Sequence, residues 1–250
     1  MRVNYGEIFQ QKSKDRKMDG TVKIPSDFTL WPDSWKNVEY KEYERFKKII
    51  LPAAESKTIN NEILSKRQSV RNFKTKSIDL QSLSNILFYS CGETKKYFDK
   101  SESKRAQASA GGRYPIEIYI FNMTDDGELK RKIYHYNVRG HHLEELWDIP
   151  EKEKLGLKKY FSGDDFIVNA SMSIVMTMVP DRSTRKYGER GYKYAYLEAG
   201  AIFGYIQHNA IINNVDTVMW GSTTEIEIEK ALDIDGISET GVLSIILNKK

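Results

Sequence analysis

The sequence predicts an α+β protein built around one central mixed, mostly antiparallel sheet flanked by helices. Three apolar runs rich in β-branched residues predict buried strands: Ile116–Phe121, Ser173–Val179 and Gly241–Leu247. A long, mostly apolar helical pattern fills 192–212, between the second and third runs. The mixture of a hairpin and strand–helix units predicts an α+β domain with one mixed sheet.

The bulk composition limits the classes of function. The 250 residues are 40% hydrophobic, which is enough for a sizeable core in one large domain or two small ones. A net charge of +4, with acids and bases interspersed, makes nucleic acid an unlikely partner. The single cysteine excludes a disulfide framework and a thiolate metal cluster. No membrane-spanning run or signal peptide is recognisable, so we expect a soluble, cytoplasmic protein.

The first 55 residues are expected to form an N-terminal arm, and residues 56–250 the main domain. Up to about residue 35 the arm has few periodic apolar positions, which predicts an irregular, extended segment that wraps the body or a partner subunit. Tyr40–Leu51 predicts a short helix that Pro52 stops.

The segment Lys66–Phe73 concentrates cations. Arg67, Ser69 and Arg71 alternate, so in an extended chain they project from one face. Guanidinium groups and a hydroxyl suit a phosphate or the polar edge of a ring. The alternative is a solvated basic linker.

A helix is predicted to follow, starting at Ser77 or Asp79 and stopping at Gly92. Its apolar stripe consists of Leu80, Leu83, Ile86 and Leu87. Cys91 is expected to be a small buried hydrophobe, because no histidine lies near it in the sequence. Residues 93–105 are charged and predict a loop.

Four small residues, Ser109 to Gly112, then allow the backbone to approach another group closely, and Arg113 adds a charge. The alternative is a tight turn before the next strand. That strand pairs across Asp125–Gly127 with a returning strand at 132–136. His135, His141 and His142 raise the question of a metal, but without a grouped carboxylate or cysteine ordinary imidazoles are favoured.

The second half predicts a charged helix at 151–160 and, after the buried strand, the long helix. This helix is apolar on most sides and so is expected to be buried, with Gly200 and Gly204 permitting close packing of a helix or a flat ligand. Glu198 is a lone acid there and should meet an arginine or backbone N–H groups. A strand at 215–220 and a short helix at 225–232 precede the last strand.

Three segments in this order resemble the nitroreductase-like FMN flavoproteins. They are Arg67–Phe73, Ser109–Pro115 and Tyr192–Gly200, and the resemblance covers roughly residues 60–247. Within that superfamily they look most like the SagB-type dehydrogenases, which oxidise azoline rings in thiazole/oxazole-containing peptides. The resemblance implies an intertwined homodimer with FMN at the subunit interface. It also implies a precursor peptide as substrate and association with a cyclodehydratase.

The resemblance also assigns roles to residues. Arg67 and Ser69 would bind the phosphate and ribityl chain, and Arg71 the pyrimidine edge of the flavin. The remaining cofactor candidates fall into three sets: Ser109, Ala110, Gly111 and Arg113, reaching the flavin of the other subunit; Glu198, Ala199 and Gly200, near flavin N5 and O4; and Gly221, Ser222 and Lys249, near the phosphate.

Two departures from the pattern matter. Ala108 stands where the superfamily commonly has proline, and the C-terminal Asn248–Lys250 lacks the usual glycine-containing tail. The second departure bears on the phosphate contact assigned to Lys249.

Azoline oxidation removes a proton from one ring carbon and a hydride, which passes to flavin N5, from its neighbour. The azoline branch carries a Lys-Tyr pair that Lys193 and Tyr194 match. We therefore expect Tyr194 to accept the proton and Lys193 to activate it or to hold the peptide. A tyrosine phenol ordinarily titrates near ~10, so it needs such a cation to act as a base near neutral pH. The alternative for Tyr194 is a packing role.

Two other functions remain open from the sequence. One is an NAD(P)H-dependent nitroreductase on the same fold, because that superfamily stacks nicotinamide on the flavin without a separate motif. The other is a flavin-free scaffold subunit of a peptide-modifying complex. The modified peptide, the choice between thiazole and oxazole, and the electron acceptor are not encoded in a recognisable motif.

Overall fold

The computed structural model describes residues 3–14, 27–31, 59–95, 104–150, 154–162 and 165–250. The helix predicted at Tyr40–Leu51 lies outside them. Within them no helix combines the length and apolarity needed to cross a membrane. The helices are α1 (Tyr5–Ser13), η1 (Phe28–Leu30), α3 (Ile59–Ser65), α4 (Leu80–Cys91), η3 (Ala110–Gly112), η4 (Lys154–Lys159), η5 (Asp165–Asn169), α5 (Asp181–Tyr187), α6 (Arg190–Ile212) and α7 (Glu225–Ala231).

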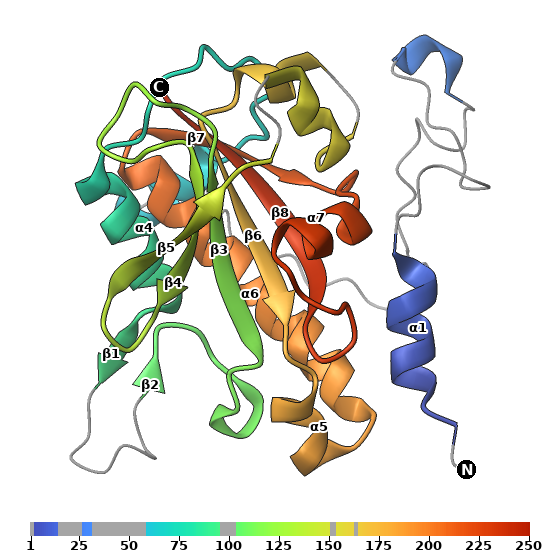
Figure 1. The fold of residues 1–250 in the computed structure, drawn as a ribbon. Helices are drawn as coiled ribbons and strands as arrows, with labels where there is room; N and C mark the ends of the chain where they lie inside the picture. The colour runs from blue at the N-terminus through green and yellow to red at the C-terminus, as the bar shows by residue number, and fades with distance from the viewer. Residues whose placement is uncertain (1–2, 15–26, 32–58, 96–103, 151–153, 163–164) are drawn as a thin grey trace, which may run out of the picture.

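A six-stranded sheet in the order β5-β4-β3-β6-β8-β7 forms the centre of the molecule (Figure 1). Its strands are β3 (Ile116–Asn122), β4 (Lys132–Asn137), β5 (His142–Asp148), β6 (Met172–Met178), β7 (Val215–Trp220) and β8 (Thr240–Lys249). All the pairings between its described strands are antiparallel. The predicted mostly antiparallel sheet is confirmed, and its three apolar runs are β3, β6 and β8.

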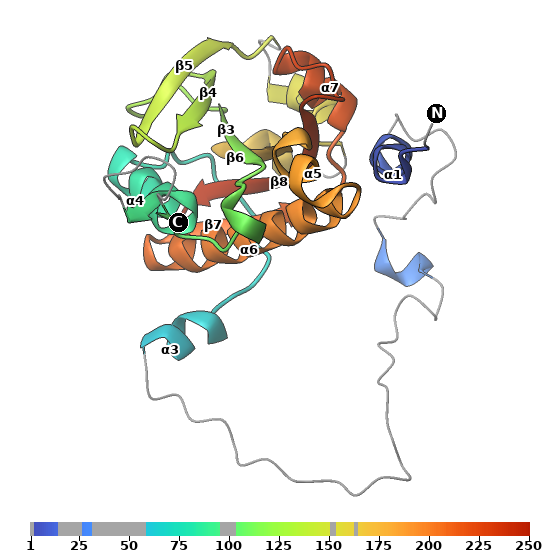
Figure 2. The same cartoon turned by 90° about the horizontal axis from the view of Figure 1, so that it is seen from below.

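The alternation of side chains along β3 explains why both faces of the sheet are covered. Ile118 and Ile120 face a core shared with α4 and α6, whereas Tyr119 and Phe121 face a second core. Residues of η4, η5 and α7 complete the second core. Figure 2 shows α6 running along one side of the sheet with α4 beside it. Helix α6 is therefore the element that carries the predicted segment Tyr192–Gly200 across the face of the sheet.

Helix α1 corrects the prediction that the start of the chain is irregular. Asn4 caps it by accepting from the Glu7 N–H at 3.0 Å, while its side-chain amide donates to the Glu7 carboxylate at 3.2 Å. This Asn-x-x-Glu pair is a local helix-start signal that the prediction overlooked. A contact far along the chain then holds the helix, since the Tyr196 hydroxyl of α6 donates to Gln10.

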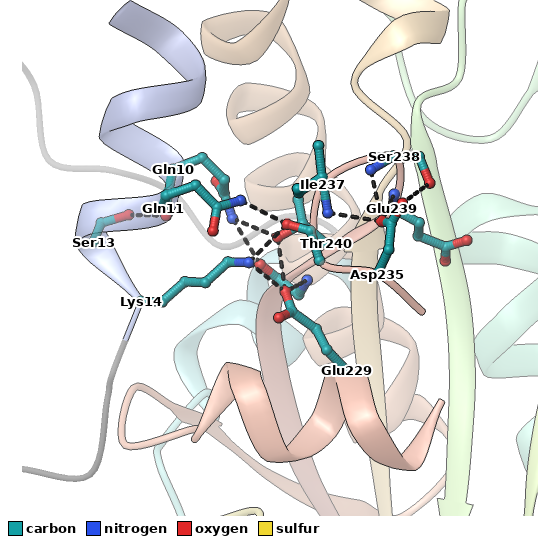
Figure 3. A network of polar contacts seen from close by, with 12 residues as sticks. Gln10, Gln11, Ser13, Lys14, Glu229, Asp235, Ile237, Ser238, Glu239 and Thr240 are labelled. Atoms are coloured by element: carbon teal, nitrogen blue, oxygen red, sulfur yellow. Dashed lines mark hydrogen bonds and ion pairs between the residues drawn. The ribbon is translucent and has the colours of Figure 1, made fainter. Parts of the chain in front are cut away.

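The end of α1 is anchored by a buried ion pair. Lys14 Nζ lies 2.8 Å from Glu229 and also donates to the Gly236 carbonyl at 2.8 Å. Gln10 donates to Thr240 at the start of β8, as Figure 3 shows. These side chains satisfy one another away from water, which is the condition for burying a charged pair. The arm thus begins with a helix fixed to α6, α7 and β8.

Two further predictions are wrong in detail. The charged stretch 93–105 includes a short antiparallel pair, β1 (Glu93–Lys95) with β2 (Lys104–Arg105), instead of only a loop. The helix predicted at 151–160 is present in its described part but is a shorter 3₁₀ helix, Lys154–Lys159. Helix α4 follows its prediction, with Asp79 as the cap and Cys91 buried at its end.

Candidate active site

The cationic segment Lys66–Phe73 starts in the turn that ends α3 and then passes beside the edge strand β7 without regular secondary structure. The Val70 N–H donates to the Thr217 carbonyl of β7 at 3.1 Å, and Phe73 packs edge-on against Phe166. The side chains of Arg67, Ser69 and Arg71 are exposed. The backbone and Phe73 therefore fix the segment, while its three predicted ligand side chains project into solvent on the described surface.

The small-residue segment is fixed far more tightly. Gly111 and Gly112 have φ of +60° and +63°, and Tyr114 follows with φ of +48°. A Cβ built on Gly111 would lie 2.4 Å from the Tyr187 hydroxyl, so no other residue fits there without a shift. Ser109 Oγ accepts from the Tyr114 N–H at 2.8 Å and closes the turn. The close approach expected of this segment is made to α5.

Glu198 points into the protein from α6. Its Oε1 accepts from Gln107 Nε2 at 3.1 Å, so its partner is an amide and not the arginine or backbone N–H groups that we predicted. Burial raises the pKa of Glu198, and the nearby Ser109 and Gln107 side chains oppose this rise only in part. Two buried oxygens of these side chains, Glu198 Oε2 and Gln107 Oε1, lack hydrogen-bond partners. Both are acceptors when Glu198 is ionised, and protonation of the carboxyl would add a donor.

The residues that follow Glu198 on α6 are more accessible to solvent. Ala199 is buried, but Gly200 and Gly204 are exposed and a Cβ on either would meet nothing within 4 Å. Leu197 and Tyr205 are also exposed, at 62% and 44%. The prediction that α6 is buried on most sides is therefore wrong for this face within a single chain, because an apolar stripe of the helix is left uncovered.

The predicted catalytic pair lies at the start of α6. Lys193 is exposed and Tyr194 half-buried. The Tyr194 ring meets the Tyr187 ring edge-on with centroids 5.0 Å apart, and the Arg190 guanidinium lies 5.9 Å from its centroid. Tyr187 also touches Gly111 through its hydroxyl. Tyr187 thus joins the predicted base to the small-residue segment.

A cavity of about 850 Å³ opens at the same place. Its walls are the start of α1 and the turn between α5 and α6, including Asn4, Tyr5, Tyr187, Glu189 and Arg190. Glu189 accepts from the Tyr5 N–H at 3.1 Å and holds the two walls together. The cavity therefore adjoins the predicted base through the shared Tyr187 side chain.

The three phosphate candidates near the C-terminus, Gly221, Ser222 and Lys249, differ in their exposure to solvent. Gly221 and Ser222 are exposed just after β7. Lys249 is engaged inside the chain, where its ammonium group bonds Asp79 at 2.8 Å and the Asn213 carbonyl at 3.1 Å. In this arrangement Lys249 supports the start of α4, and a phosphate would have to compete with Asp79 for it.

The structure brings the segments Ser109–Pro115 and Tyr192–Gly200 together but leaves Arg67–Phe73 apart from them. The small-residue segment lies near the start of β8. The Pro115 carbonyl accepts from the Val179 N–H, and the preceding residue, Met178, pairs with Thr240. Val70 instead lies beside Thr217, which pairs with Leu247 near the other end of β8. At about 3.3 Å per residue, these two ends of β8 are roughly 20 Å apart. Figure 1 shows the C-terminal end of β8 at the top and α5 at the bottom.

Three residues of this site carried no role in the sequence-based prediction: Gln107, Tyr187 and Arg190. Gln107 stands two residues before Ser109, and Arg190 four before Tyr194, so their spacing from predicted residues was a usable signal. Tyr187 belongs to another helix that ends at Gly188, whose φ is +58°, and only the fold brings it to Tyr194.

The three histidines do not form a cluster. His135 lies between two carboxylates, those of Glu117 and Glu144, whereas His141 bonds Ser84 and Tyr136. Within the described residues no three His, Cys, Asp or Glu side chains could hold a metal ion together. Cys91 is buried, and burial raises the pKa of its thiol to about 12, so it is an unreactive packing residue as predicted.

Comparison with known proteins places this geometry in a family. Residues 64–247 match the model of the nitroreductase family. A Methanocaldococcus jannaschii protein named as a nitroreductase, MJ1384, is 30% identical over 173 residues, which cover 69% of this chain and 83% of that protein. The trifolitoxin-processing protein TfxB of Rhizobium leguminosarum bv. trifolii is 24% identical over 69% of this chain and 47% of its own length.

A further relative and a solved structure point the same way. The microcin B17-processing protein McbC of Escherichia coli is 23% identical over 55% of this chain and 51% of its own length. The matches to TfxB and McbC thus span about half of those proteins. The E. coli microcin synthetase McbBCD complex with truncated pro-MccB17 bound contains a chain of the same fold, with a TM-score of 0.74, 15% identity, and coverage of 100% of this chain and 94% of that one. The chain belongs to the nitroreductase family, and its similarity to TfxB and McbC is consistent with the SagB-type branch expected from the sequence.

Proposed function

We propose that the protein is an FMN-dependent dehydrogenase that oxidises thiazoline or oxazoline rings in a ribosomally made peptide to thiazoles or oxazoles. The observation that carries this proposal is the contact of Tyr187 with both Gly111 and Tyr194. It puts the predicted proton acceptor beside the segment expected to meet the flavin. The relatives named for peptide processing support the substrate class.

The residues present suit a flat cofactor with a phosphate. The backbone around Gly200 and Gly221 has no atom within 4 Å of a built Cβ, which leaves room for a ring or a phosphate to approach. Arg67, Arg71 and Arg113 are exposed cations of the kind that bind phosphate oxygens and the polar edge of a flavin. A solved family neighbour, from Desulfovibrio desulfuricans, is a complex with FMN.

The protein side chains divide the chemistry between them. Bound FMN would supply the hydride acceptor. Tyr194 takes the proton from the adjacent ring carbon, so that the substrate loses two hydrogens in all. A tyrosine that acts as a base needs a positive neighbour, and the Arg190 guanidinium, 5.9 Å from the Tyr194 ring centroid, provides one. Lys193, exposed on the same helix, is assigned to holding the peptide. The cavity between α1 and α6 receives the peptide on either side of the reacting ring.

We also propose that the site forms between two chains. Within one chain, roughly 20 Å along β8 separates the cationic segment from the small-residue segment. Leu197 and Tyr205 leave an apolar stripe on α6 exposed, and the small Gly200 and Gly204 allow a second helix to approach it closely. A homodimer packed on this face covers the stripe and lets Arg67–Arg71 of one chain meet Ser109–Arg113 of the other. The division into an arm (1–55) and an FMN-binding domain (56–250) belongs to the same proposal.

The experiment uses the purified yellow protein and an azoline-containing peptide. Conversion to azole is followed by mass spectrometry as a loss of about 2 Da per ring, which is two hydrogens. Tyr194→Phe and Lys193→Ala should retain FMN and lose most of this activity. Leu155→Ala, an exposed residue of η4, is the control. Full activity in both site variants would remove the catalytic assignment.

One alternative is supported by a specific finding. The relative with 30% identity is named as a nitroreductase, and that activity would use NAD(P)H as reductant. Anaerobic mixing with NADH or NADPH separates the two functions, since rapid bleaching of the flavin with no azoline oxidation favours the reductase. A protein that takes up no FMN at all would instead be a scaffold subunit of a complex with a cyclodehydratase.

A further inference from the structure

A cluster of charged residues ties the small-residue segment to α5, and three of its members, Arg182, Glu117 and His135, have no role in the family resemblance or in the proposed chemistry. Arg113 Nε donates to the Arg182 carbonyl at 3.0 Å. In the other direction, Arg182 Nη1 donates to the Tyr114 carbonyl at 3.1 Å. Each arginine thus holds the backbone of the other's segment, and the two bonds form a reciprocal clasp between 113–114 and the first turn of α5.

The clasp acts where the backbone most needs support. Three residues, Gly111, Gly112 and Tyr114, have positive φ within four positions. For Tyr114 this conformation is costly and persists only where the surroundings enforce it. The Arg105 guanidinium covers the Tyr114 ring at 4.6 Å, and the Ser109 hydroxyl holds its N–H. Arg182 holds the carbonyl of the same residue, so Tyr114 is fixed at three points.

Arg182 is itself held by a chain of charges across the sheet. Its Nη1 also contacts the carboxylate of Glu117 on β3. The other Glu117 oxygen lies 3.1 Å from His135 Nε2 on β4, and His135 Nδ1 lies 2.8 Å from Glu144 on β5. An imidazolium donates to both carboxylates at once, whereas a neutral imidazole can donate to only one.

Titratable and charged groups face His135 from each of the elements that pack around it. Glu144 also accepts from Asn137 at 2.8 Å and lies 3.6 Å from His142. The Tyr119 ring tilts over His135 at 5.2 Å, with its hydroxyl bound to Glu239. With Glu117 and Arg182, the immediate environment contains more carboxylate than cation unless His135 is protonated. Hydrogen bonds to Glu117 and Glu144 raise the pKa of His135, although burial opposes this.

We propose that Arg182, supported by Glu117 and His135, is a positioning residue that fixes the small-residue segment for flavin binding, and that the clasp loosens when His135 loses its proton. The flavin-binding part of this inference rests on the proposed function. The clasp itself is a property of the folded chain and can be measured without FMN.

The sign of the pH dependence follows from the groups involved. Because the pKa of His135 is raised above 6.5, its stabilising charge is fully present below pH 6.5 and is lost as the pH rises through the folded-state value. Burial would raise the pKa of Glu117, but His135 and Arg182 together lower it below 4.5. The clasp is therefore firmest between these two ranges, in mildly acidic to neutral solution.

The test compares two arginines of the same helix. Arg182→Gln removes the guanidinium bonds to the Tyr114 carbonyl and to Glu117, which is the side-chain half of the clasp, and leaves the bond from Arg113 to the backbone carbonyl at 182. Arg185→Gln removes only an exposed ion pair with Asp181 on the same helix. FMN affinity is measured by quenching of free FMN fluorescence. We expect the Kd to rise about tenfold or more in Arg182→Gln, as for the loss of hydrogen bonds from a charged donor, and to stay unchanged in Arg185→Gln. Arg182→Lys, which keeps the charge, should recover part of the affinity.

A second measurement separates positioning from a general loss of stability. The wild-type Kd should rise between about pH 6 and about pH 9, and His135→Gln should remove this dependence. Titration of the FMN phosphate affects both proteins equally and cancels in the comparison. Equal affinities for FMN in Arg182→Gln and wild type, or an unchanged pH profile in His135→Gln, would overturn the proposal.

Hydrogen exchange at the Tyr114 amide keeps the inference testable apart from flavin binding. Protection in the FMN-free protein should fall in Arg182→Gln and, in the wild type, at a pH above the His135 transition. If the wild type binds no FMN but shows this exchange pattern, the proposed function fails and the clasp stands. If Arg182→Gln does not fold, Glu117→Gln and the wild-type pH series decide the question, and protection that is independent of both contradicts the clasp.

Discussion

The two arginine-containing segments assigned to the flavin differ in how the chain holds them. Arg67–Arg71 is attached through the Val70 backbone, and its ligand side chains are exposed. Ser109–Arg113 is also partly exposed, but its backbone is held by the bond between Ser109 Oγ and the Tyr114 N–H and by the bond from Arg113 to the Arg182 carbonyl of α5. The difference indicates that the second segment is formed before any ligand binds, whereas the side chains of the first are ordered by the ligand, a partner chain or both.

The largest effect is expected where the preformed segment is most constrained. Gly111→Ala places a methyl group 2.4 Å from the Tyr187 hydroxyl at a φ of +60°. Positive φ at a residue other than glycine costs about 1 kcal/mol or more, and the ends of the Tyr187 and Lys186 side chains must also shift, so FMN affinity should fall by roughly tenfold. Equilibrium dialysis with FMN measures this.

A double variant separates the two causes. Gly111→Ala with Tyr187→Phe removes the overlap with the Tyr187 oxygen but keeps the unfavourable φ and the approach of Lys186 Nζ at 2.6 Å, so it should recover only part of the affinity. Full recovery would show that backbone conformation does not matter at this position, and no loss in the single variant would show that the segment is not preformed as described.

Arg71→Ala tests whether the cationic segment contributes to FMN binding without contributing to the stability of the fold. Its guanidinium is exposed, so the melting temperature of the FMN-free protein should stay within about 1 °C of wild type, as for surface substitutions in general. FMN affinity should fall about tenfold through loss of a charged hydrogen bond. Differential scanning fluorimetry with and without FMN gives both quantities. A lower melting temperature without FMN would mean that Arg71 is part of the fold, and unchanged affinity would return the segment to a solvated linker.

Arg67→Ala sharpens the assignment of the phosphate. If Arg67 binds the phosphate, the wild type should prefer FMN over riboflavin, and the variant should lose several-fold of this preference, about the contribution of one partly exposed charged contact. Titration with both flavins is the measurement. Lys249→Ala is the comparison, because Lys249 already bonds Asp79. If Arg67→Ala keeps the wild-type preference for FMN over riboflavin, Arg67 does not bind the phosphate.

The smallest effect concerns the buried acid beside the preformed segment. Glu198→Gln replaces one carboxylate oxygen with an N–H donor, so the pair of side chains has fewer buried acceptors without partners. Burial raises the pKa of Glu198, so the native carboxyl contributes most stability below pH 4.5 and loses this contribution as the pH rises through its folded-state value. The variant should melt a few degrees higher near pH 8 and equally near pH 4. A lower melting temperature near pH 8 would mean that the charged form is the one stabilised.

The sequence predicted most of the sheet because its strands carry a strong local signal. Buried strands such as Ile116–Phe121 are continuously apolar, and α4 has both its cap and its stop in adjacent residues. Helix α1 was missed because its apolar periodicity is weak and its stability comes from Gln10 and Lys14 contacts more than 180 positions away. No window of local sequence contains such contacts.

The candidate site also contains residues that local sequence could reveal and residues that only the fold brings together. Residues with unusual backbone needs, such as Gly111, stand out in the sequence. Residues that act through the fold, such as Tyr187 and Arg182, look like ordinary members of a charged helix. Lys249 shows the converse, since a resemblance assigned it to phosphate while the fold engages it with Asp79. The assignment of the cofactor residues stays a prediction.

The central claim is that one flavin is held by Arg67–Arg71 of one chain and Ser109–Arg113 of another. Co-expression of an Arg71→Ala chain and a Gly111→Ala chain with different affinity tags gives a heterodimer that can be purified and its FMN counted by absorbance. A site between chains leaves one wild-type site in that dimer, so we expect one FMN per heterodimer although both homodimers are depleted. A heterodimer as depleted as the homodimers would contradict the account, because it would place both segments of each site in the same chain.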